Sequence, residues 1–227
     1  MIDPSSLAEL KAFIRSRTRP LPVPLVPEIV TYQADELTAL WHATSAELAP
    51  WDPAPFWAFP WAGGQAVARY VLDWPEVVRG KTVLDFASGS GLVAIAAARA
   101  GAARVVACDL DPFARAAIEL NAELNGVEIG WREGDLLGGE LPGVDVVLAG
   151  DVFYERALSE ASLAWLSTLR ARGVLTLVGD PGRLYTPRDG LIDWASYDVP
   201  TSSEIESTAV LRTSVQEVLP RATAVAG

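Results

Sequence analysis

The fold of this chain is decided by a single stretch of sequence. It runs Thr82-Val83-Leu84-Asp85-Phe86-Ala87-Ser88-Gly89-Ser90-Gly91-Leu92-Val93-Ala94 and, after a small apolar run, continues Val105-Val106-Ala107-Cys108-Asp109. The pattern predicts a strand, a glycine turn, a helix and a second strand that ends on an acid. This order is typical of a βαβ unit that binds a nucleotide.

The glycine turn alone is compatible with a dinucleotide. Gly89-Ser90-Gly91-Leu92-Val93-Ala94 matches the pattern G-x-G-x-x-G/A, and Asp109 lies 20 residues after Gly89, where an acid binds ribose hydroxyls. A dinucleotide, however, places an anionic pyrophosphate against the helix N-terminus. Asp85 is unfavourable beside that anion. It is favourable beside the α-amino group of S-adenosylmethionine, which carries a ribose and an adenine and no phosphate. Asp85 therefore favours S-adenosylmethionine as the ligand.

Strands and helices alternate regularly from residue 82 onward. Strands are expected over 82–86, 104–109, 127–131, 144–149 and 173–179, and helices over 91–100, 112–124 and 156–170. The strands are short, apolar and rich in Val, as in a parallel sheet that is covered on both faces. After an expected loop over 181–190, residues 194–199 and 207–216 predict a closing antiparallel pair. The expected fold class is α/β, with a Rossmann-like, doubly wound, mostly parallel seven-stranded sheet and an antiparallel C-terminal strand.

The spacing Asp85-x-Ala87-x-Gly89-x-Gly91 resembles the first motif of class I methyltransferases, which reads acid-x-Gly-x-Gly-x-Gly. This chain departs from the motif by carrying Ala87 in the first glycine position. Because a residue with a Cβ disfavours positive φ, we expect Ala87 to adopt an ordinary backbone conformation. The resemblance implies S-adenosylmethionine as cofactor and S-adenosylhomocysteine as product. It also implies that Asp109 binds the ribose and that Asp135 lies near the adenine amino group.

Further segments resemble the seven-β-strand protein-lysine methyltransferases, in the branch of the electron transfer flavoprotein β-subunit lysine methyltransferases. They are Phe56-Trp57-Ala58-Phe59-Pro60-Trp61-Ala62-Gly63-Gly64-Gln65-Ala66, Val77-Val78-Arg79-Gly80-Lys81-Thr82-Val83-Leu84-Asp85, Asp109-Leu110-Asp111-Pro112, Asn121-x-Glu123-Leu124-Asn125, Gly150-Asp151-Val152-Phe153-Tyr154-Glu155 and Val178-Gly179-Asp180-Pro181-Gly182-Arg183. Asp151-x-x-Tyr154 corresponds to the acid-x-x-tyrosine signature of this branch. The resemblance implies a protein substrate with a target lysine, and electron transfer flavoprotein β-subunit is the leading candidate.

The candidate site residues follow from these segments. The cofactor-binding candidates are Trp61, Gly64, Asp85, Ala87, Ser88, Gly89, Gly91, Asp109, Leu110, Asp135, Leu136 and Gly150. Trp61 is expected to cover the cofactor, and Gly64 to permit its close approach. Asp151 is expected to align the substrate amine by accepting its hydrogen bonds. Tyr154 is expected to line a lysine channel or, alternatively, to pack under the following helix. Glu155 either attracts the substrate ammonium or interacts with the helix dipole.

Two other functions stay open. The aromatic and proline-rich residues 50–61 are able to form a closed pocket, so an N-methyltransferase for a small amine or a nicotinamide-like pyridine is an alternative. The glycine turn also leaves open a less favoured reading, an NAD-dependent dehydrogenase or a non-catalytic nucleotide binder.

The composition bounds the partners and the compartment. A net charge of −11 argues against a general nucleic-acid binder, because phosphate neutralisation needs clustered Lys and Arg. No apolar run has the length of a membrane span, and no secretory signal pattern is visible. The single cysteine, Cys108, fits a reducing cytoplasm, and the lack of a His/Cys cluster predicts no metal site. We therefore expect a cytoplasmic monomer without nucleic-acid or membrane partners.

The first 60 residues are expected to form an extension packed on the methyltransferase domain, which would span 61–220 and precede a flexible tail over 221–227. Residues 3–16 and 34–47 predict two helices. Between them, four prolines within residues 20–27 exclude a helix and predict an extended arm.

Overall fold

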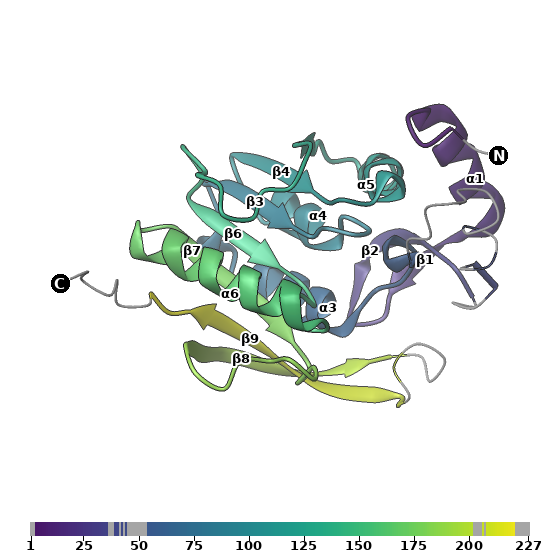
Figure 1. The fold of residues 1–227 in the computed structure, drawn as a ribbon. Helices are drawn as coiled ribbons and strands as arrows, with labels where there is room; N and C mark the ends of the chain where they lie inside the picture. The colour runs from purple at the N-terminus through teal and green to yellow at the C-terminus, as the bar shows by residue number, and fades with distance from the viewer. Residues whose placement is uncertain are drawn as a thin grey trace.

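The structure, a computed structural model, describes residues 3–35, 39, 40, 42, 44, 54–201, 206 and 208–220. Its centre is a seven-stranded sheet with helices on both faces (Figure 1). The strand order is β5 (Gly130–Trp131), β4 (Arg104–Cys108), β3 (Thr82–Phe86), β6 (Val146–Ala149), β7 (Leu175–Asp180), β9 (Val210–Val218) and β8 (Leu191–Pro200). The first five strands in this order are parallel, and β9 runs antiparallel between β7 and β8. The expected fold class is confirmed.

Two buried apolar layers hold helices against the sheet. The helices are α1 (Leu7–Arg17), α3 (Ala62–Asp73), α4 (Leu92–Arg99), α5 (Pro112–Asn125) and α6 (Arg156–Ala171), with short 3-10 helices η1 (Phe56–Ala58) and η2 (Pro75–Val77). On one face, Val71 of α3 and Val93 of α4 pack with Val83 of the sheet. On the other face, Leu166 of α6 packs with Val147. Strand residues point alternately to the two faces, so a sheet covered on both faces requires the continuous apolar strands seen in the sequence.

The sequence specifies the ends of α5 closely. Asp111 caps its first turn by accepting a hydrogen bond from the backbone N–H of Phe113, and Pro112 occupies the first turn, where no donor is needed. Gly126 ends the helix in the left-handed conformation, with φ of 64°. Capping by Asp111 therefore fixes where α5 begins, three residues after Asp109, the acid that follows β4.

The proline-rich segment is extended, as expected, but the chain reverses between Val23 and Val26, so a β-hairpin stands where an arm was expected over 20–27. β1 (Arg19–Val23) pairs antiparallel with β2 (Val26–Gln33). The prolines do exclude a helix. Pro20 and Pro22 fit within β1 because it pairs on one side only, and an edge strand tolerates residues that lack an N–H donor.

Two asparagines of α5 attach this hairpin to the helical layer of the main domain. Asn125 donates to the carbonyl of Val30 and accepts from its N–H, and Asn121 accepts from the N–H of Tyr32. Below these bonds, Ile29 packs in a buried cluster with Ile95 of α4. The N-terminal segment is thus bound to the same helices that carry the glycine turn.

Most other expected elements are present, with ends that differ by a few residues. The helix expected over 3–16 is α1, and the strand expected over 127–131 is shortened to β5. The helix expected over 34–47 falls largely outside the described residues, and the tail over 221–227 lies outside them entirely. In the part of the chain that the structure describes, no helix is both long and apolar enough to cross a membrane.

The strand order reverses at β3, which lies between β4 and β6. In open α/β sheets, a crevice forms beyond the carboxyl ends of the strands at such a reversal. The fold therefore predicts a binding site formed by residues at the carboxyl ends of β3, β4 and β6.

Candidate active site

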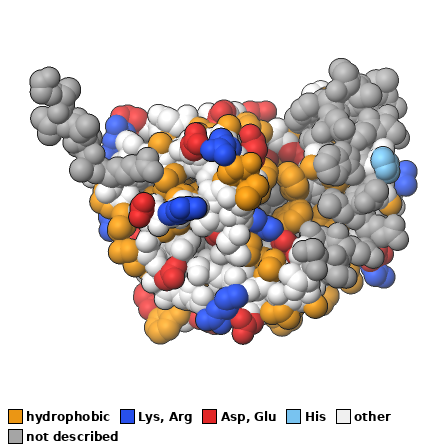
Figure 2. Space-filling view, turned by 60° about the horizontal axis from the view of Figure 1, so that its bottom comes forward, with side chains coloured by type: hydrophobic (Ala, Val, Ile, Leu, Met, Phe, Trp, Pro, Cys, Tyr) orange, Lys and Arg blue, Asp and Glu red, His pale blue; other side chains and the backbone are white. Residues whose placement is uncertain are grey.

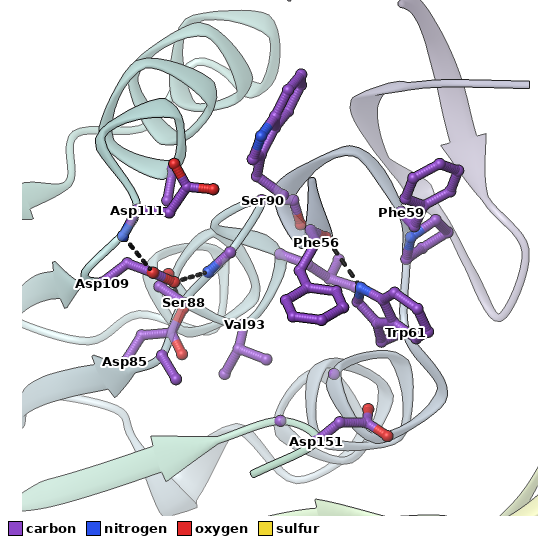
Figure 3. Close-up of a pocket in the computed structure, with 18 of the residues that line it drawn as sticks. Phe56, Phe59, Trp61, Asp85, Ser88, Ser90, Val93, Asp109, Asp111 and Asp151 are labelled. Atoms are coloured by element: carbon purple, nitrogen blue, oxygen red, sulfur yellow. Dashed lines mark hydrogen bonds between the residues drawn. The ribbon is translucent and has the colours of Figure 1, made fainter. Parts of the chain in front are cut away.

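A cavity of about 410 Å³ opens at this reversal point (Figure 3). Acids at the ends of β3 and β4 form one side, and aromatic rings from residues 56–61 form the opposite side. Of the residues singled out from the sequence, the structure brings together Trp61, Gly64, Asp85, Ala87, Ser88, Gly89, Asp109, Leu110, Gly150, Asp151 and Tyr154 in this lining.

Asp85 is buried at the end of β3 and organises the glycine turn. One of its carboxylate oxygens, Oδ2, accepts from the Ser88 hydroxyl and, at 3.0 Å, from the N–H of Ala94 in α4. Only 1% of Asp85 is exposed. Burial raises the pKa of this carboxyl to about 7, with a smaller contribution from Asp109, while the two hydrogen bonds oppose the increase. A cationic group in the cavity would stabilise the ionised form.

Ala87 has a φ of 52°, so the expectation of an ordinary backbone conformation at this position was wrong. Among the described residues it is the one non-glycine residue with positive φ. The turn is fixed by the next two residues, because Ser88 donates to the carbonyl of Cys108 and Gly89 donates to the Asp109 carboxylate. Adjacent strands thereby impose a left-handed conformation that costs a residue with a Cβ about 1–2 kcal/mol.

Asp109 and Asp111 follow β4 and face the same cavity. Asp109 accepts from the N–H groups of Gly89 and Asp111, which ties the glycine turn to the end of β4. Burial raises the pKa of both carboxyls, and for Asp111 the charge of Asp109 adds to the effect and brings the pKa to about 7. Three carboxyl groups with raised pKa values thus line one cavity, which makes it receptive to positive charge.

The aromatic wall is a contiguous set of rings. The Phe56 ring centroid lies 5.5 Å from that of Trp61 and 5.4 Å from that of Tyr154. The Trp61 indole N–H donates to the carbonyl of Phe56 at 2.9 Å, which fixes the turn between η1 and α3. Tyr154 is therefore packed against Phe56 and still lines the cavity, which is compatible with a role in a substrate channel.

Close backbone packing brings α3 to the ends of β6 and β7. A Cβ added to Gly150 would lie 3.1 Å from the backbone nitrogen of Gly64. A Cβ added to Gly63 would collide with the carbonyl oxygen of Gly179. By contrast, a Cβ added to Gly64 would have one neighbour, Val93, at 4.0 Å. Gly63 and Gly150 are thus the glycines that the packing of α3 against β6 and β7 requires, and the expected role of Gly64 in admitting the cofactor stays a prediction.

Four candidate residues lie outside the cavity lining. Gly91 begins α4 with a φ of 79°, and an added Cβ would lie 3.0 Å from Ile118, so its role is in helix packing. Asp135 is exposed and accepts from the N–H of Leu137, while Leu136 is buried in the α6 core layer. Glu155 is exposed at the start of α6. Roles for these four in binding or catalysis stay predictions.

Comparison with known proteins assigns the family. The family model of ribosomal protein L11 methyltransferase matches residues 69–150. The electron transfer flavoprotein beta subunit lysine methyltransferase of Mus musculus is 36% identical over 86% of this chain and 78% of its own length. The Homo sapiens protein of the same name is 42% identical over 77% of this chain and 67% of its own. The chain belongs to this methyltransferase family.

The fold agrees with this assignment. A solved magnesium protoporphyrin IX methyltransferase from Synechocystis PCC 6803 matches with a TM-score of 0.50 at 19% identity, over 68% of this chain and 80% of that one. At this identity the likeness concerns the fold alone. The resemblance that the sequence motifs indicated is confirmed, and the chain is a methyltransferase.

Sequence reasoning missed three charged residues of the methyltransferase site: Asp111 and Arg183, which line the cavity, and Glu206, which pairs with Arg183. Asp151 accepts from the N–H of Gly63 through Oδ2 and pairs through Oδ1 with the guanidinium of Arg183, which lines the cavity. The same guanidinium pairs with both carboxylate oxygens of Glu206. The position of Arg183 directly after β7 was an available signal, since strand ends build such sites. Glu206 gave none, because its contact with Arg183 joins residues that lie 23 positions apart in the sequence.

The charge of the lining is strongly biased. Within the described ranges of the chain, the residues with charged side chains in the lining are Asp85, Asp109, Asp111, Asp151 and Arg183, so four carboxyls accompany one guanidinium. Burial raises the pKa of Asp151 to about 6 even though Arg183 lowers it. Among the residues that the structure describes, no group of three or more His, Cys, Asp and Glu side chains is placed to hold a metal ion.

Proposed function

We propose that this methyltransferase transfers a methyl group from S-adenosylmethionine to a lysine side chain of a protein, and that the protein is an electron transfer flavoprotein β-subunit. Support for the substrate comes from the relatives named for that activity, at 36% and 42% identity. Support from the structure comes from one observation: Asp151 and Tyr154 line the same cavity as the acids at the ends of β3 and β4.

The donor set of the cavity fits S-adenosylmethionine better than a dinucleotide. Four carboxyls would repel a pyrophosphate, whereas an ammonium and a sulfonium would be attracted. We propose that Asp85 meets the α-amino group and that Asp109 meets the ribose hydroxyls. Trp61 and Phe56 would cover the cofactor from the aromatic side.

When bound, S-adenosylmethionine supplies a methyl group activated by a sulfonium. In the transfer, the carbon–sulfur bond would break as the carbon–nitrogen bond forms, and the electron pair would stay on sulfur to leave S-adenosylhomocysteine. The protein's contribution is to position the amine and exclude water. Lysine has a pKa of about 10.4 and attacks as the neutral amine, so its ammonium would first lose one proton to bulk water. Asp151 would orient the amine by accepting a hydrogen bond, and the Tyr154 and Phe56 rings would line the path of the lysine side chain.

The test is methyl transfer to the purified β-subunit with radiolabelled cofactor, followed by hydrolysis and identification of the labelled amino acid. Label in methyl-lysine supports the proposal. Label that appears in small molecules alone, when a cell extract is supplied, would establish the small-amine alternative. Asp151→Asn should abolish most of the transfer and leave S-adenosylhomocysteine binding intact. Asp145→Asn, an exposed carboxylate at the opposite end of the sheet, is the matched control.

We also propose that the enzyme acts as a cytoplasmic monomer on a protein and not on nucleic acid. The net charge of −11 and the single cysteine support this. On the face that carries β8 and β9, the described Lys and Arg side chains stand singly among acidic and apolar ones (Figure 2). Light scattering of the purified enzyme, alone and with substrate, measures the oligomeric state.

A further inference from the structure

Arg183 is the centre of a buried ion network on the wall of the active-site cavity. Its Nε lies 2.7 Å from Oδ1 of Asp151, and its Nη1 and Nη2 lie 2.7 and 2.6 Å from the two carboxylate oxygens of Glu206. The exposed fractions of the three side chains are 19% for Arg183, 8% for Asp151 and 5% for Glu206. The guanidinium carbon also lies 5.8 Å from the centroid of the Trp61 ring.

Stability alone gives a weak reason for such a network. Removing charged groups from water is costly, and apolar replacements of buried ion pairs are often neutral or stabilising. Here two carboxylates share one guanidinium, so one negative charge is left uncompensated. The network is therefore better explained by what it does to Asp151 than by its contribution to folding.

We propose that Arg183 is a positioning residue of the methyl-transfer site, which fixes the Asp151 carboxylate at the cavity wall and is itself fixed by Glu206. The inference rests on the proposed function, because it assigns Asp151 the task of orienting the substrate amine.

The geometry determines the orientation of the Asp151 carboxylate at both oxygens. The N–H of Gly63, in the first turn of α3, holds Oδ2, and the guanidinium of Arg183 holds Oδ1. A planar guanidinium that binds one carboxylate through two nitrogens has little freedom to rotate, and Glu206 provides that second anchor. The backbone of Arg183 is held as well, because its N–H donates to the buried Asp180 carboxylate at the end of β7.

The charges around Asp151 predict opposite effects for the two partners. Among the described residues, the titratable or charged groups that face it are Arg183 from the β7–β8 connection, Glu206 from the β8–β9 connection and Tyr154 from its own loop. Arg183 lowers the pKa of Asp151 and Glu206 raises it. Loss of Arg183 should therefore move the titration of Asp151 to higher pH, and loss of the Glu206 charge should move it to lower pH.

The experiment compares Arg183→Gln, Arg183→Lys and Glu206→Gln in the full chain. Methyl transfer to the β-subunit is measured from pH 5 to 9, S-adenosylhomocysteine binding by calorimetry, and the Asp151 carboxyl by ¹³C NMR titration, assigned with Asp151→Asn. Arg170→Gln is the matched control, since Arg170 forms a comparable guanidinium–carboxylate pair with Glu217 between α6 and β9, away from the cavity. Arg183→Lys keeps a cation and guards against loss of folding in Arg183→Gln.

For Arg183→Gln, we expect kcat to fall about 100-fold, as for a misplaced catalytic group, with S-adenosylhomocysteine affinity unchanged. The acid limb of its pH profile and the Asp151 midpoint should both rise, and Arg183→Lys should recover part of the rate. Glu206→Gln should lower the Asp151 midpoint and reduce kcat less. A Tm loss with normal kcat in Arg183→Gln would overturn the proposal. So would a parallel loss of S-adenosylhomocysteine binding, which would make Arg183 a cofactor ligand.

The NMR titration separates this inference from the proposed function. If the wild-type enzyme methylates a small amine and no protein, the proposed function is wrong, and the same variants are compared with that acceptor. If the Asp151 midpoint is the same in Arg183→Gln, Glu206→Gln and the wild type, the positioning role is wrong whatever the substrate.

Discussion

Asp85→Asn should stabilise the ligand-free enzyme at neutral and alkaline pH while weakening its affinity for the cofactor. The pKa of the buried Asp85 carboxyl is about 7, against an ordinary value of 3.8. Because the folded protein binds this proton more tightly than the unfolded chain, ionisation costs stability as the pH rises from about 4 to about 7. The difference of about three pH units corresponds to about 4 kcal/mol at pH 8.

The amide is able to keep the hydrogen bonds that the carboxylate makes. Ser88 and Ala94 both donate to the same carboxylate oxygen, Oδ2, and the carbonyl oxygen of the introduced amide would accept both from that place. The variant therefore loses the charge and retains the turn. For a domain of this size, about 4 kcal/mol corresponds to an increase in Tm of roughly 10 °C.

The assay is urea unfolding of both proteins at pH 5, 6, 7 and 8, together with calorimetric binding of S-adenosylhomocysteine. The wild type should lose about 1.4 kcal/mol of unfolding free energy per pH unit relative to Asp85→Asn between pH 5 and 7. Asp145→Asn, which removes an exposed carboxylate, controls for the change in net charge. Parallel pH profiles for the wild type and Asp85→Asn, with equal ligand affinity, would refute both the raised pKa and the role of Asp85 in binding.

Four substitutions test the glycine turn, the packing of α3 and the attachment of the hairpin. Gly63→Ala and Gly64→Ala form a matched pair. Ala87→Gly should raise the unfolding free energy by about 0.5–1 kcal/mol, since relief of the positive φ outweighs the entropy cost of glycine, and chemical denaturation measures it. Gly63→Ala should lower stability by about 2–3 kcal/mol because its Cβ meets β7. Gly64→Ala should keep or raise Tm while weakening S-adenosylhomocysteine binding measured by calorimetry. Asn125→Ala should cost about 2–4 kcal/mol in denaturation, because it leaves two backbone groups of Val30 unpaired; a smaller loss would mean that water replaces the amide.

The sequence was sufficient for the sheet and for half of the site. Short apolar runs placed β3, β4, β6 and β7, and the acid at position 85 distinguished two cofactor classes that share a glycine turn. These features depend on local composition and on the rule that strand ends meet at one edge. For that reason, Asp85, Asp109 and Asp151 meet in one cavity as expected.

The features that the sequence did not reveal depend on contacts between distant segments. The hairpin of β1 and β2 follows from pairing and from the Asn121 and Asn125 amides, about 90 residues away along the chain. The φ of Ala87 is set by Cys108 and Asp109 on the neighbouring strand, which override its own preference. The backbone propensity of a residue reflects the residue itself and its neighbours in sequence, so it does not predict a φ that a neighbouring strand imposes.

Several costs to folding converge on the same cavity, and this is informative about what the cavity binds. Ala87 is held at positive φ, three carboxyls have pKa values of about 6 or 7, and Asp151 and Glu206 share one guanidinium. Strain and uncompensated charge of this kind persist where function requires them, because most substitutions that relieve them would increase stability. A ligand that brings positive charge would offset the cost of ionising these buried carboxyls, and it would stabilise the folded protein by an amount set by its affinity. The methyl donor and a lysine ammonium both bring such charge, whereas a nicotinamide dinucleotide would add to the imbalance. The arrangement of charge in the cavity therefore argues for the same methyl donor as the strand-end acid at position 85 and is in line with the proposed lysine substrate.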